Sequence, residues 1–137
     1  MGYLPIVSKP ILDVELESVD GRALKVQALF DTGSFYTILR EACLPPGTPT
    51  LPFARPRIMG TAARGGQLTV TGATRFEIRI GEKIIEDDVL LSPDLGREML
   101  IGSGTMQKWD ITVRNESGRT DVVVGRDRRD PEITEVD

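Results

Sequence analysis

Apolar and polar residues alternate along residues 11–17, a pattern typical of a strand with one buried face. The pair Asp20-Gly21 follows, and Asp-Gly favours a tight hairpin turn. Residues 23–30 then supply the return strand, which closes in an apolar run and stops abruptly at Asp31. The pattern therefore predicts an N-terminal hairpin whose second strand ends in a carboxylate.

Further short segments have the length and apolar character of strands and are separated by turn residues. They lie at residues 37–39, 74–80, 83–91, 99–102, 110–114 and 120–124. Residues 57–72 form two extendable arms around a glycine-rich tip, which predicts a projecting hairpin, and residues 102–108 predict one or two turns of helix. Five prolines at residues 45–57 indicate a loop, because proline cannot supply ladder hydrogen bonds in the middle of a sheet. The sequence is thus that of an all-β chain with one short helix near its end.

Length and composition indicate one compact domain over residues 1–125, followed by a charged tail at residues 126–137 that we expect to be mobile. The net charge of -4 at pH 7 gives no basic surface for nucleic acid. No apolar run approaches the length of a membrane span, and the first residues do not follow the pattern of a signal peptide. We therefore expect a cytoplasmic protein that binds neither nucleic acid nor membranes.

Two residue types limit the chemistry that this chain can perform. It contains no histidine, which excludes Ser-His-Asp and Cys-His catalysis and most catalytic zinc sites. Its one cysteine, Cys43, allows no disulfide within the chain and no thiolate metal cluster, and we expect it to be a packing residue. We expect no metal or organic cofactor.

The segment Asp31-Thr32-Gly33-Ser34 carries the strongest chemical signal in the chain. Burial of a carboxylate costs stability unless neighbours compensate, so a carboxylate at the end of an apolar strand is usually there for chemistry. An ordinary turn after a strand is the alternative, because Asp, Thr and Gly all suit turns. The motif occurs once, so a mechanism that needs two carboxylates would need a second copy of the chain.

Three marks in a fixed order resemble the retropepsin-like aspartic proteases, the single-domain relatives of pepsin. Residues 31–39 read Asp-Thr-Gly-Ser-Phe-Tyr-Thr-Ile-Leu, where the family has Asp-Thr/Ser-Gly-Ala/Ser and then Thr with two apolar residues. Residues 100–102 (Leu-Ile-Gly) match the family's apolar pair before a glycine and a short helix. Residues 61–66 lie between these marks, at the place of the family's flap hairpin. The order and spacing agree over about residues 11–113, and the part after the flap resembles bacterial and archaeal members.

The resemblance implies an all-β, closed β-barrel-like acid protease (retropepsin) fold with a flap hairpin and one short C-terminal helix. It implies an aspartic endopeptidase in which Asp31 from each of two subunits of a homodimer activates water to hydrolyse a peptide bond. Thr32, Gly33 and Ser34 would support the loop, the Thr32 hydroxyl by bonding across the dimer and the Gly33 N–H by donating to the carboxylate. The flap and pocket that hold the substrate as an extended strand would be formed by Thr61, Ala62, Ala63, Arg64, Gly65, Gly66, Phe35 and Tyr36.

Three details of this implied site have alternatives. Ser34 could add a hydrogen bond to the ionised carboxylate and so move the activity optimum toward acid, which is a hypothesis. Phe35 and Tyr36 could pack in the core or in an interface rather than line a pocket. The glycine-rich segment could be a simple hairpin tip. We expect Trp109 to anchor the core or a dimer contact.

The sequence also departs from the retroviral members of the family. Those carry an acidic residue four places after the catalytic aspartate, paired with an arginine just after the helix glycine. Phe35 and Ser103 occupy these places here, so that ion pair is absent. The alternative function is a dimeric peptide-binding or assembly module of the same fold, with little or no catalysis.

Overall fold

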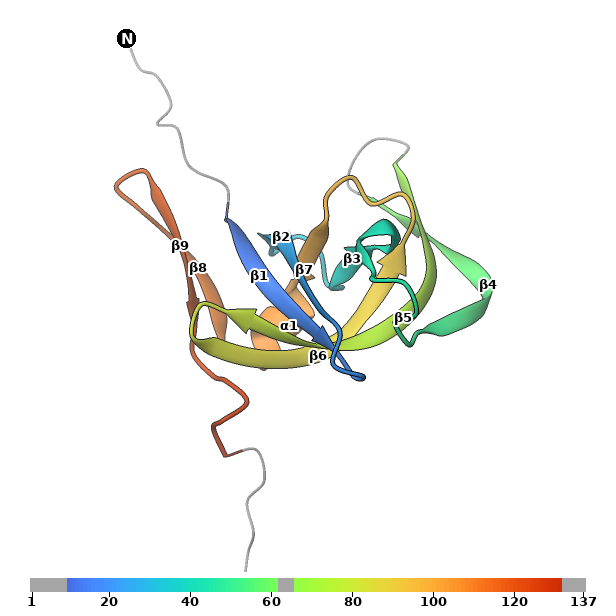
Figure 1. Cartoon of the computed structure of the whole chain (residues 1–137). Helices are drawn as coiled ribbons and strands as arrows, with labels where there is room; N and C mark the ends of the chain where they lie inside the picture. Colours follow the sequence, from blue (N-terminus) through green and yellow to red (C-terminus); the bar gives the residue numbers. More distant parts are fainter. Residues whose placement is uncertain (1–9, 62–65, 132–137) are drawn as a thin grey trace, which may run out of the picture.

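The computed structural model describes residues 10–61 and 66–131 of the 137-residue chain, and these form an all-β protein with one short α-helix (Figure 1). The strands are β1 (Ile11–Ser18), β2 (Ala23–Asp31), β3 (Ile38–Arg40), β4 (Leu51–Gly60), β5 (Gln67–Ile80), β6 (Lys83–Ser92), β7 (Met99–Gly102), β8 (Ile111–Glu116) and β9 (Arg119–Val124). A 3-10 turn, η1 (Glu41–Cys43), follows β3, and the helix α1 (Ser103–Lys108) follows β7. None of the helices in the described part of the chain has the length and apolar character needed to cross a membrane.

Six strands close into a barrel in the order β1-β2-β7-β3-β6-β5, because the far end of β5 pairs back onto β1. At this closure Glu15 of β1 lies opposite Arg79 of β5. β4 adds to β5 as an edge strand, and β8 with β9 forms a separate two-stranded sheet (Figure 1). The structure thus confirms the expected all-β, closed barrel with one short helix.

The barrel interior is filled by the alternating residues that the sequence pattern predicts. Every second residue of β5 from Leu68 to Ile80 is buried. Phe30 of β2 and Phe76 of β5 are among the largest fully buried side chains, and each such burial stabilises the fold by about 1.5–3 kcal/mol. Because Phe30 directly precedes Asp31, core packing fixes the end of β2 at the point where the carboxylate emerges.

The proline-rich segment differs in part from the loop that its sequence predicts. β4 begins already at Leu51 and pairs with β5, with a register shift between Pro52 and Arg57. An edge strand tolerates proline, since one of its sides needs no hydrogen-bond partner, and β4 is the last strand of its sheet. β5 runs without interruption through Gly72, where a Cβ would lie 2.8 Å from the Leu51 carbonyl oxygen. Glycine here permits the close approach of the two strands.

The structure gives residues 126–131 fixed partners, where the charge pattern indicated a solvated tail. The Arg128 N–H donates to the Ile84 carbonyl oxygen of β6 at 2.6 Å. The buried Asp127 carboxylate accepts hydrogen bonds from the Ile84 N–H and from the Arg129 side chain. The bonds from Arg129 hold the pKa of the Asp127 carboxyl far below its ordinary value. Residues 127–129 therefore bond to each other and to the neighbouring strands, and residues 132–137 of the expected tail lie outside the described residues.

Candidate active site

Asp31 is the last residue of β2 and lies in parallel register with Gly102, the last residue of β7. Its half-buried carboxylate accepts a hydrogen bond at Oδ1 from the Gly33 N–H, at 2.9 Å. A Cβ at Gly33 would lie 3.2 Å from the same oxygen, so glycine leaves the carboxylate room. Two adjacent parallel strands therefore bring the carboxylate and the start of α1 to one place.

The N–H groups of residues 102–104 hold the loop that follows Asp31. They donate in turn to Thr37 Oγ1 at 3.1 Å, to the Ser34 carbonyl oxygen at 2.6 Å and to the Phe35 carbonyl oxygen at 3.0 Å. Backbone groups at a helix start have no partner within the helix, and here the loop supplies those partners. The first turn of α1 thus fixes the conformation of the candidate catalytic loop.

Each residue of the Leu-Ile-Gly motif at residues 100–102 is suited to its position for a different physical reason. Ile101 is fully buried in the core, and Leu100 lines the pocket described below. A Cβ at Gly102 would lie 2.5 Å from the Phe35 carbonyl oxygen, so any larger residue would push the loop away. The glycine is required by close approach of two backbones.

The expected roles of Ser34 and Thr32 in the loop differ in how they agree with the structure. The Ser34 hydroxyl donates to the Tyr36 carbonyl oxygen at 3.1 Å, so its one proton does not reach Asp31. This geometry contradicts the hypothesis that Ser34 bonds to the ionised carboxylate. The Thr32 side chain is exposed and has no hydrogen-bond partner within the described part of the chain, and its bond across a dimer stays a prediction.

Phe35 and Tyr36 pack on each other rather than together in the core. Their rings meet edge to face with centroids 5.2 Å apart, and Phe35 is 62% exposed. The Arg57 guanidinium of β4 stands 5.5 Å from the Tyr36 ring centroid, within range of a cation–π contact. The half-buried Tyr36 also packs against a small cluster that contains Ile38 and Leu68. In the single chain, Phe35 is therefore a surface residue beside Asp31.

A pocket of about 310 Å³ opens beside Asp31. One wall is the loop and the other is the tip end of the β4–β5 hairpin, so the lining includes Asp31, Ser34, Phe35, Tyr36, Met59 and Thr61. Ile38, Leu68 and Leu100 complete it and make it mostly apolar. Segments far apart in sequence thus meet at the carboxylate, as the resemblance led us to expect.

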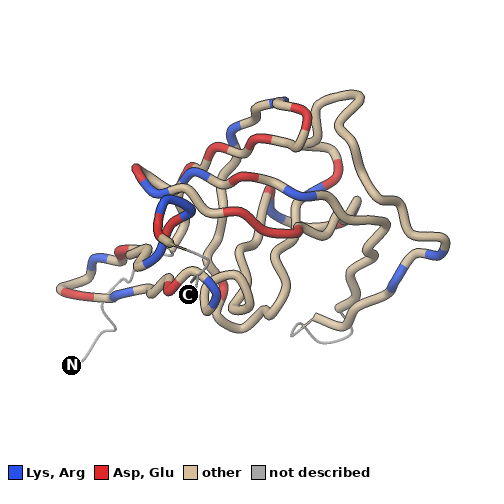
Figure 2. The backbone as a smooth tube through the Cα atoms, turned by 90° about the horizontal axis from the view of Figure 1, so that it is seen from below, with Lys and Arg blue, Asp and Glu red and all other residues tan. Residues whose placement is uncertain are grey.

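At the tip end of the β4–β5 hairpin, just beyond the last strand pair, the Thr61 N–H donates to the Gly66 carbonyl oxygen at 3.0 Å. The other expected flap residues, 62–65, lie outside the described residues. In β4 and in β5 up to residue 74, Arg55 and Arg57 are the charged residues, and this part of the backbone is otherwise uncharged (Figure 2). Apart from Arg55 and Arg57, the described arms of the hairpin next to the pocket therefore carry no charged side chain.

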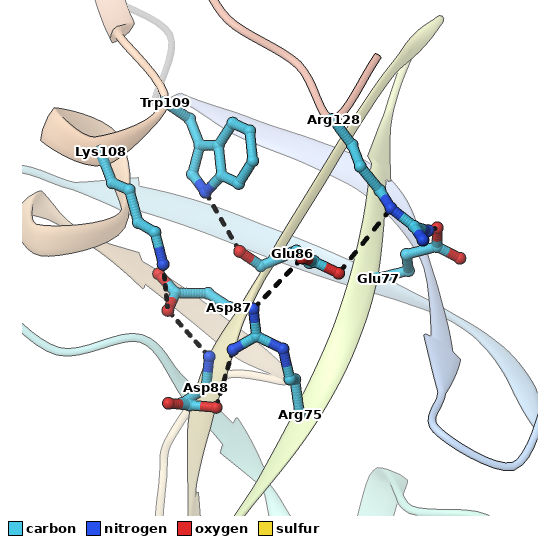
Figure 3. Close-up of polar contacts among 8 residues, drawn as sticks. All are labelled: Arg75, Glu77, Glu86, Asp87, Asp88, Lys108, Trp109 and Arg128. Atoms are coloured by element: carbon cyan, nitrogen blue, oxygen red, sulfur yellow. Dashed lines mark hydrogen bonds and ion pairs between the residues drawn. The ribbon is translucent and has the colours of Figure 1, made fainter. Parts of the chain in front are cut away.

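A larger hollow of about 440 Å³ lies elsewhere on the barrel, between β5, β6 and the turn after β1, and it is lined by charged side chains. Arg128 pairs there with Glu77 and lies 3.9 Å from Glu86 (Figure 3). Arg75 pairs with Glu86 at 3.3 Å and with Asp88 at 3.0 Å. Both arginines are thus engaged by carboxylates, so the smaller pocket beside Asp31 is the better candidate for chemistry.

Two residues that no sequence signal marked support the loop, Thr105 by direct contact and Asp87 through Thr105. Thr37 Oγ1 lies 2.5 Å from Thr105 Oγ1, and the Thr105 hydroxyl donates to Asp87 Oδ2 at 2.8 Å. Both threonines are buried, and buried hydroxyls need partners. The apolar surroundings of Thr37 in the motif could have signalled that a polar partner exists, but not which residue supplies it.

Trp109 and Cys43 are core residues, as expected. Trp109 is 3% exposed, and its Nε1–H donates to the Glu86 carbonyl oxygen at 3.1 Å. Cys43 is half-buried and packs against the main apolar core. Burial raises the pKa of the Cys43 thiol, which keeps it protonated and unreactive.

Comparisons with known proteins agree with the architecture. No protein-family model matches the sequence, and no curated protein matches it either. Among solved structures, the chain is similar to EIAV protease complexed with the inhibitor HBY-793, with a TM-score of 0.52 and 18% identity. The likeness covers 78% of this chain and 93% of that chain. At this identity the likeness concerns the fold alone: the chain has a retropepsin-like fold, which confirms the fold that the motifs implied.

Proposed function

We propose that the retropepsin-like fold of this chain carries an aspartic endopeptidase that works as a homodimer. One observation supports this above all: the Asp31 carboxylate, held by the Gly33 N–H, stands at the wall of a mostly apolar pocket beneath the β4–β5 hairpin. The likeness to EIAV protease, a protease bound to an inhibitor, adds support from the fold.

Each chain supplies one Asp-Thr-Gly loop, so the second carboxylate comes from a second copy across a two-fold axis. Two carboxylates about 3 Å apart cannot both be ionised, so the pair shares one proton. The ionised Asp31 takes a proton from a water molecule, whose oxygen attacks the peptide carbonyl carbon. The protonated Asp31 of the other copy gives its proton to the carbonyl oxygen. As the tetrahedral intermediate collapses, the Asp31 that took the water proton gives it to the leaving amine, and the other Asp31 takes back a proton from the intermediate's hydroxyl, with no covalent bond to the enzyme.

The surrounding residues orient the carboxylate and the substrate. The Gly33 N–H fixes one oxygen of Asp31 and leaves the other free to face water and the partner carboxylate. Thr32 is exposed, and in the proposed dimer its hydroxyl would bond to the partner loop. A peptide bound as an extended strand would pair with the backbone of the hairpin, in the way that strands are added to sheets.

The pocket indicates which side chains the enzyme accepts next to the cut bond. Phe35, Ile38 and Leu100 present apolar surface to it, and about 310 Å³ is room for one large aliphatic or aromatic side chain. We therefore expect preference for hydrophobic residues around the scissile bond.

The test is digestion of a diverse peptide mixture from about pH 3 to pH 8, the range in which paired carboxylates titrate, read by mass spectrometry. Wild type, Asp31→Asn and Asp13→Asn are compared at equal concentration. Asp31→Asn keeps the shape of the side chain but cannot act as acid or base, so cleavage should fall by at least about 10²-fold. Asp13 is 55% exposed on β1, and its variant should match wild type.

Sedimentation equilibrium at the assay concentrations completes the experiment. A dimer that cleaves, with activity lost only in Asp31→Asn, is the expected result. A dimer that cleaves nothing at any pH would overturn the proposal in favour of the peptide-binding module. Activity from a monomer, or activity that survives Asp31→Asn, would overturn the two-carboxylate mechanism.

A further inference from the structure

The helix α1 holds the candidate catalytic loop, yet it is too short to be stable by itself. It has six residues, and isolated helices shorter than about 12 residues are marginal in water. Its N-cap, Gly102, has no side chain that could cap it. Because the N–H groups of residues 102–104 fix the loop, whatever anchors α1 also sets the surroundings of Asp31.

Asp87 of β6 is the place where two side chains of α1 converge. The Thr105 hydroxyl donates to Oδ2 at 2.8 Å. Figure 3 shows Lys108 reaching the same carboxylate, with its Nζ 3.8 Å from Oδ1. The Asp88 N–H donates to Oδ1 at 2.8 Å as well. The Asp87 side chain is only 17% exposed, so these polar neighbours compensate for the cost of burying its carboxylate. The carboxylate thus ties α1 to the barrel.

Asp87 also sets the direction of a chain of hydrogen bonds that ends at the loop. A carboxylate can only accept, so the single proton of the Thr105 hydroxyl is used on Asp87. In the 2.5 Å contact between the two threonines, Thr37 must therefore donate to Thr105 Oγ1. Thr37 Oγ1 is then free to accept from the Gly102 N–H, as it does at 3.1 Å.

We propose that Asp87 is a positioning residue for the catalytic loop: it anchors α1 and orients the Thr105 and Thr37 hydroxyls, and so holds Asp31 in place. The inference rests on the proposed function, because it takes Asp31 as the catalytic group. Asp87 does not line the pocket beside Asp31 and acts only through α1. The apolar pocket wall does not depend on it, so its loss should lower kcat and leave KM nearly unchanged.

Replacement of Asp87 by asparagine tests the direction of the chain without changing its shape. If the amide oxygen faces the Asp88 N–H, the amide NH₂ faces Thr105 and makes that hydroxyl an acceptor. Thr105 then donates to Thr37, whose own proton loses its partner. If the amide turns round, its NH₂ meets the Asp88 N–H, and two donors oppose each other. The first arrangement leaves the Thr37 proton without an acceptor and reverses the two hydroxyl bonds, and the second leaves the Asp88 N–H without an acceptor.

The experiment measures kcat, KM and the hydrogen exchange of the amides of residues 102–104 in the full chain. Asp87→Asn should lower kcat about 10-fold or more, the effect of losing a hydrogen bond to a charged group, and should speed this exchange about as much. Asp88→Asn is the matched control, because Asp88 lies next along β6 and bonds Arg75. It should change neither quantity. Thr105→Val should reproduce the loss, and Thr105→Ser, which keeps the hydroxyl, should restore kcat.

The two proposals fail in different ways. Unchanged kcat and unchanged exchange in Asp87→Asn, in an enzyme that cleaves peptides, would overturn the role of Asp87 alone. A wild type without peptidase activity would overturn the proposed function, and the exchange of residues 102–104 would still decide whether Asp87 holds the loop. If Asp87→Asn does not fold, the Thr105→Val and Thr105→Ser pair decides: equal kcat in both overturns the inference.

Discussion

The pocket beside Asp31 and the hollow beside Arg75 and Arg128 are both open to the surface of the barrel, but their charges are arranged in opposite ways. In the hollow, each of these two arginines contacts two carboxylates. In the pocket, the Asp31 carboxylate accepts from the Gly33 N–H and has no cationic partner among the described residues. The walls around it are mostly apolar.

This difference indicates which hollow is built for chemistry. Exposed ion pairs contribute little each, about 0–1 kcal/mol, and charges that satisfy each other have no reactivity left over. A carboxylate that lies beside apolar surface without a positively charged partner lowers the stability of the fold. Such destabilising arrangements are expected at functional sites. The larger hollow is therefore surface structure, and the smaller one is the candidate site.

Among the substitutions that test this difference between the two hollows, Gly102→Ala should have the largest effect. The new Cβ would clash with the Phe35 carbonyl oxygen, so the loop must move. We expect the free energy of unfolding to fall by about 3 kcal/mol and peptidase activity by about 10²-fold. Chemical denaturation and the peptide assay measure the two effects. In Gly96→Ala the added Cβ meets nothing within 4 Å, and the contrast breaks if this control loses as much.

A smaller effect, confined to the pocket, is expected of Phe35→Ala. Because Phe35 is 62% exposed, its loss should change the free energy of unfolding by no more than about 0.5 kcal/mol. Loss of its apolar surface from the pocket should lower kcat/KM for hydrophobic substrates about 10-fold. Val19→Ala, at a residue 68% exposed outside this pocket, should alter neither. A large loss of stability would instead identify Phe35 as a packing residue.

The smallest effect is expected of Asp127→Asn, at the residue next to Arg128 of the hollow and outside the pocket beside Asp31. Hydrogen bonds from Arg129 lower the pKa of the Asp127 carboxyl in the folded chain below its ordinary value of 3.8. The resulting stability is fully present above that value and is lost as the pH falls through the lower, folded-state pKa. The variant should therefore be less stable at neutral pH, and its stability should fall less steeply in acid.

Thermal unfolding across the acid range measures this slope, and kcat should equal that of wild type. Asp121→Asn serves as the control, because Asp121 is 50% exposed and pairs with Arg119 on a surface hairpin. Equal acid slopes in wild type and Asp127→Asn would show that the residues after β9 do not stabilise the fold.

The strand pattern predicted an all-β chain, and the closed barrel and the place of the candidate site came from what the resemblance of the motifs implied. Alternation predicted β1 and β2, and the Asp-Thr-Gly and Leu-Ile-Gly marks predicted two strand ends, which the parallel register of Asp31 and Gly102 now joins. Each of these signals is local, since it depends on neighbours along the chain. The homodimer and the role of Thr32 involve a second chain, and they stay predictions.

What the sequence did not reveal depends on contacts between distant segments. Thr37, Thr105 and Asp87 lie in three separate segments and have ordinary neighbours, so nothing local marks them as one chain of hydrogen bonds. The alternating charges around Asp127 suggested solvent, because the sequence does not show that β6 offers the segment backbone partners. Likewise, the prolines of β4 indicated a loop, since only the sheet order reveals an edge.

The bonds that shape the Asp31 loop have a consequence for the way the protein is made. Thr37 and Gly102 are 65 residues apart, and β7 inserts between β2 and β3. A ribosome therefore releases the Asp-Thr-Gly loop long before it releases the segment that gives the loop its shape. In the proposed peptidase, the active-site loop therefore cannot take its final shape before residues 102–104 have been synthesised, so no premature active site meets the nascent chain or its neighbours.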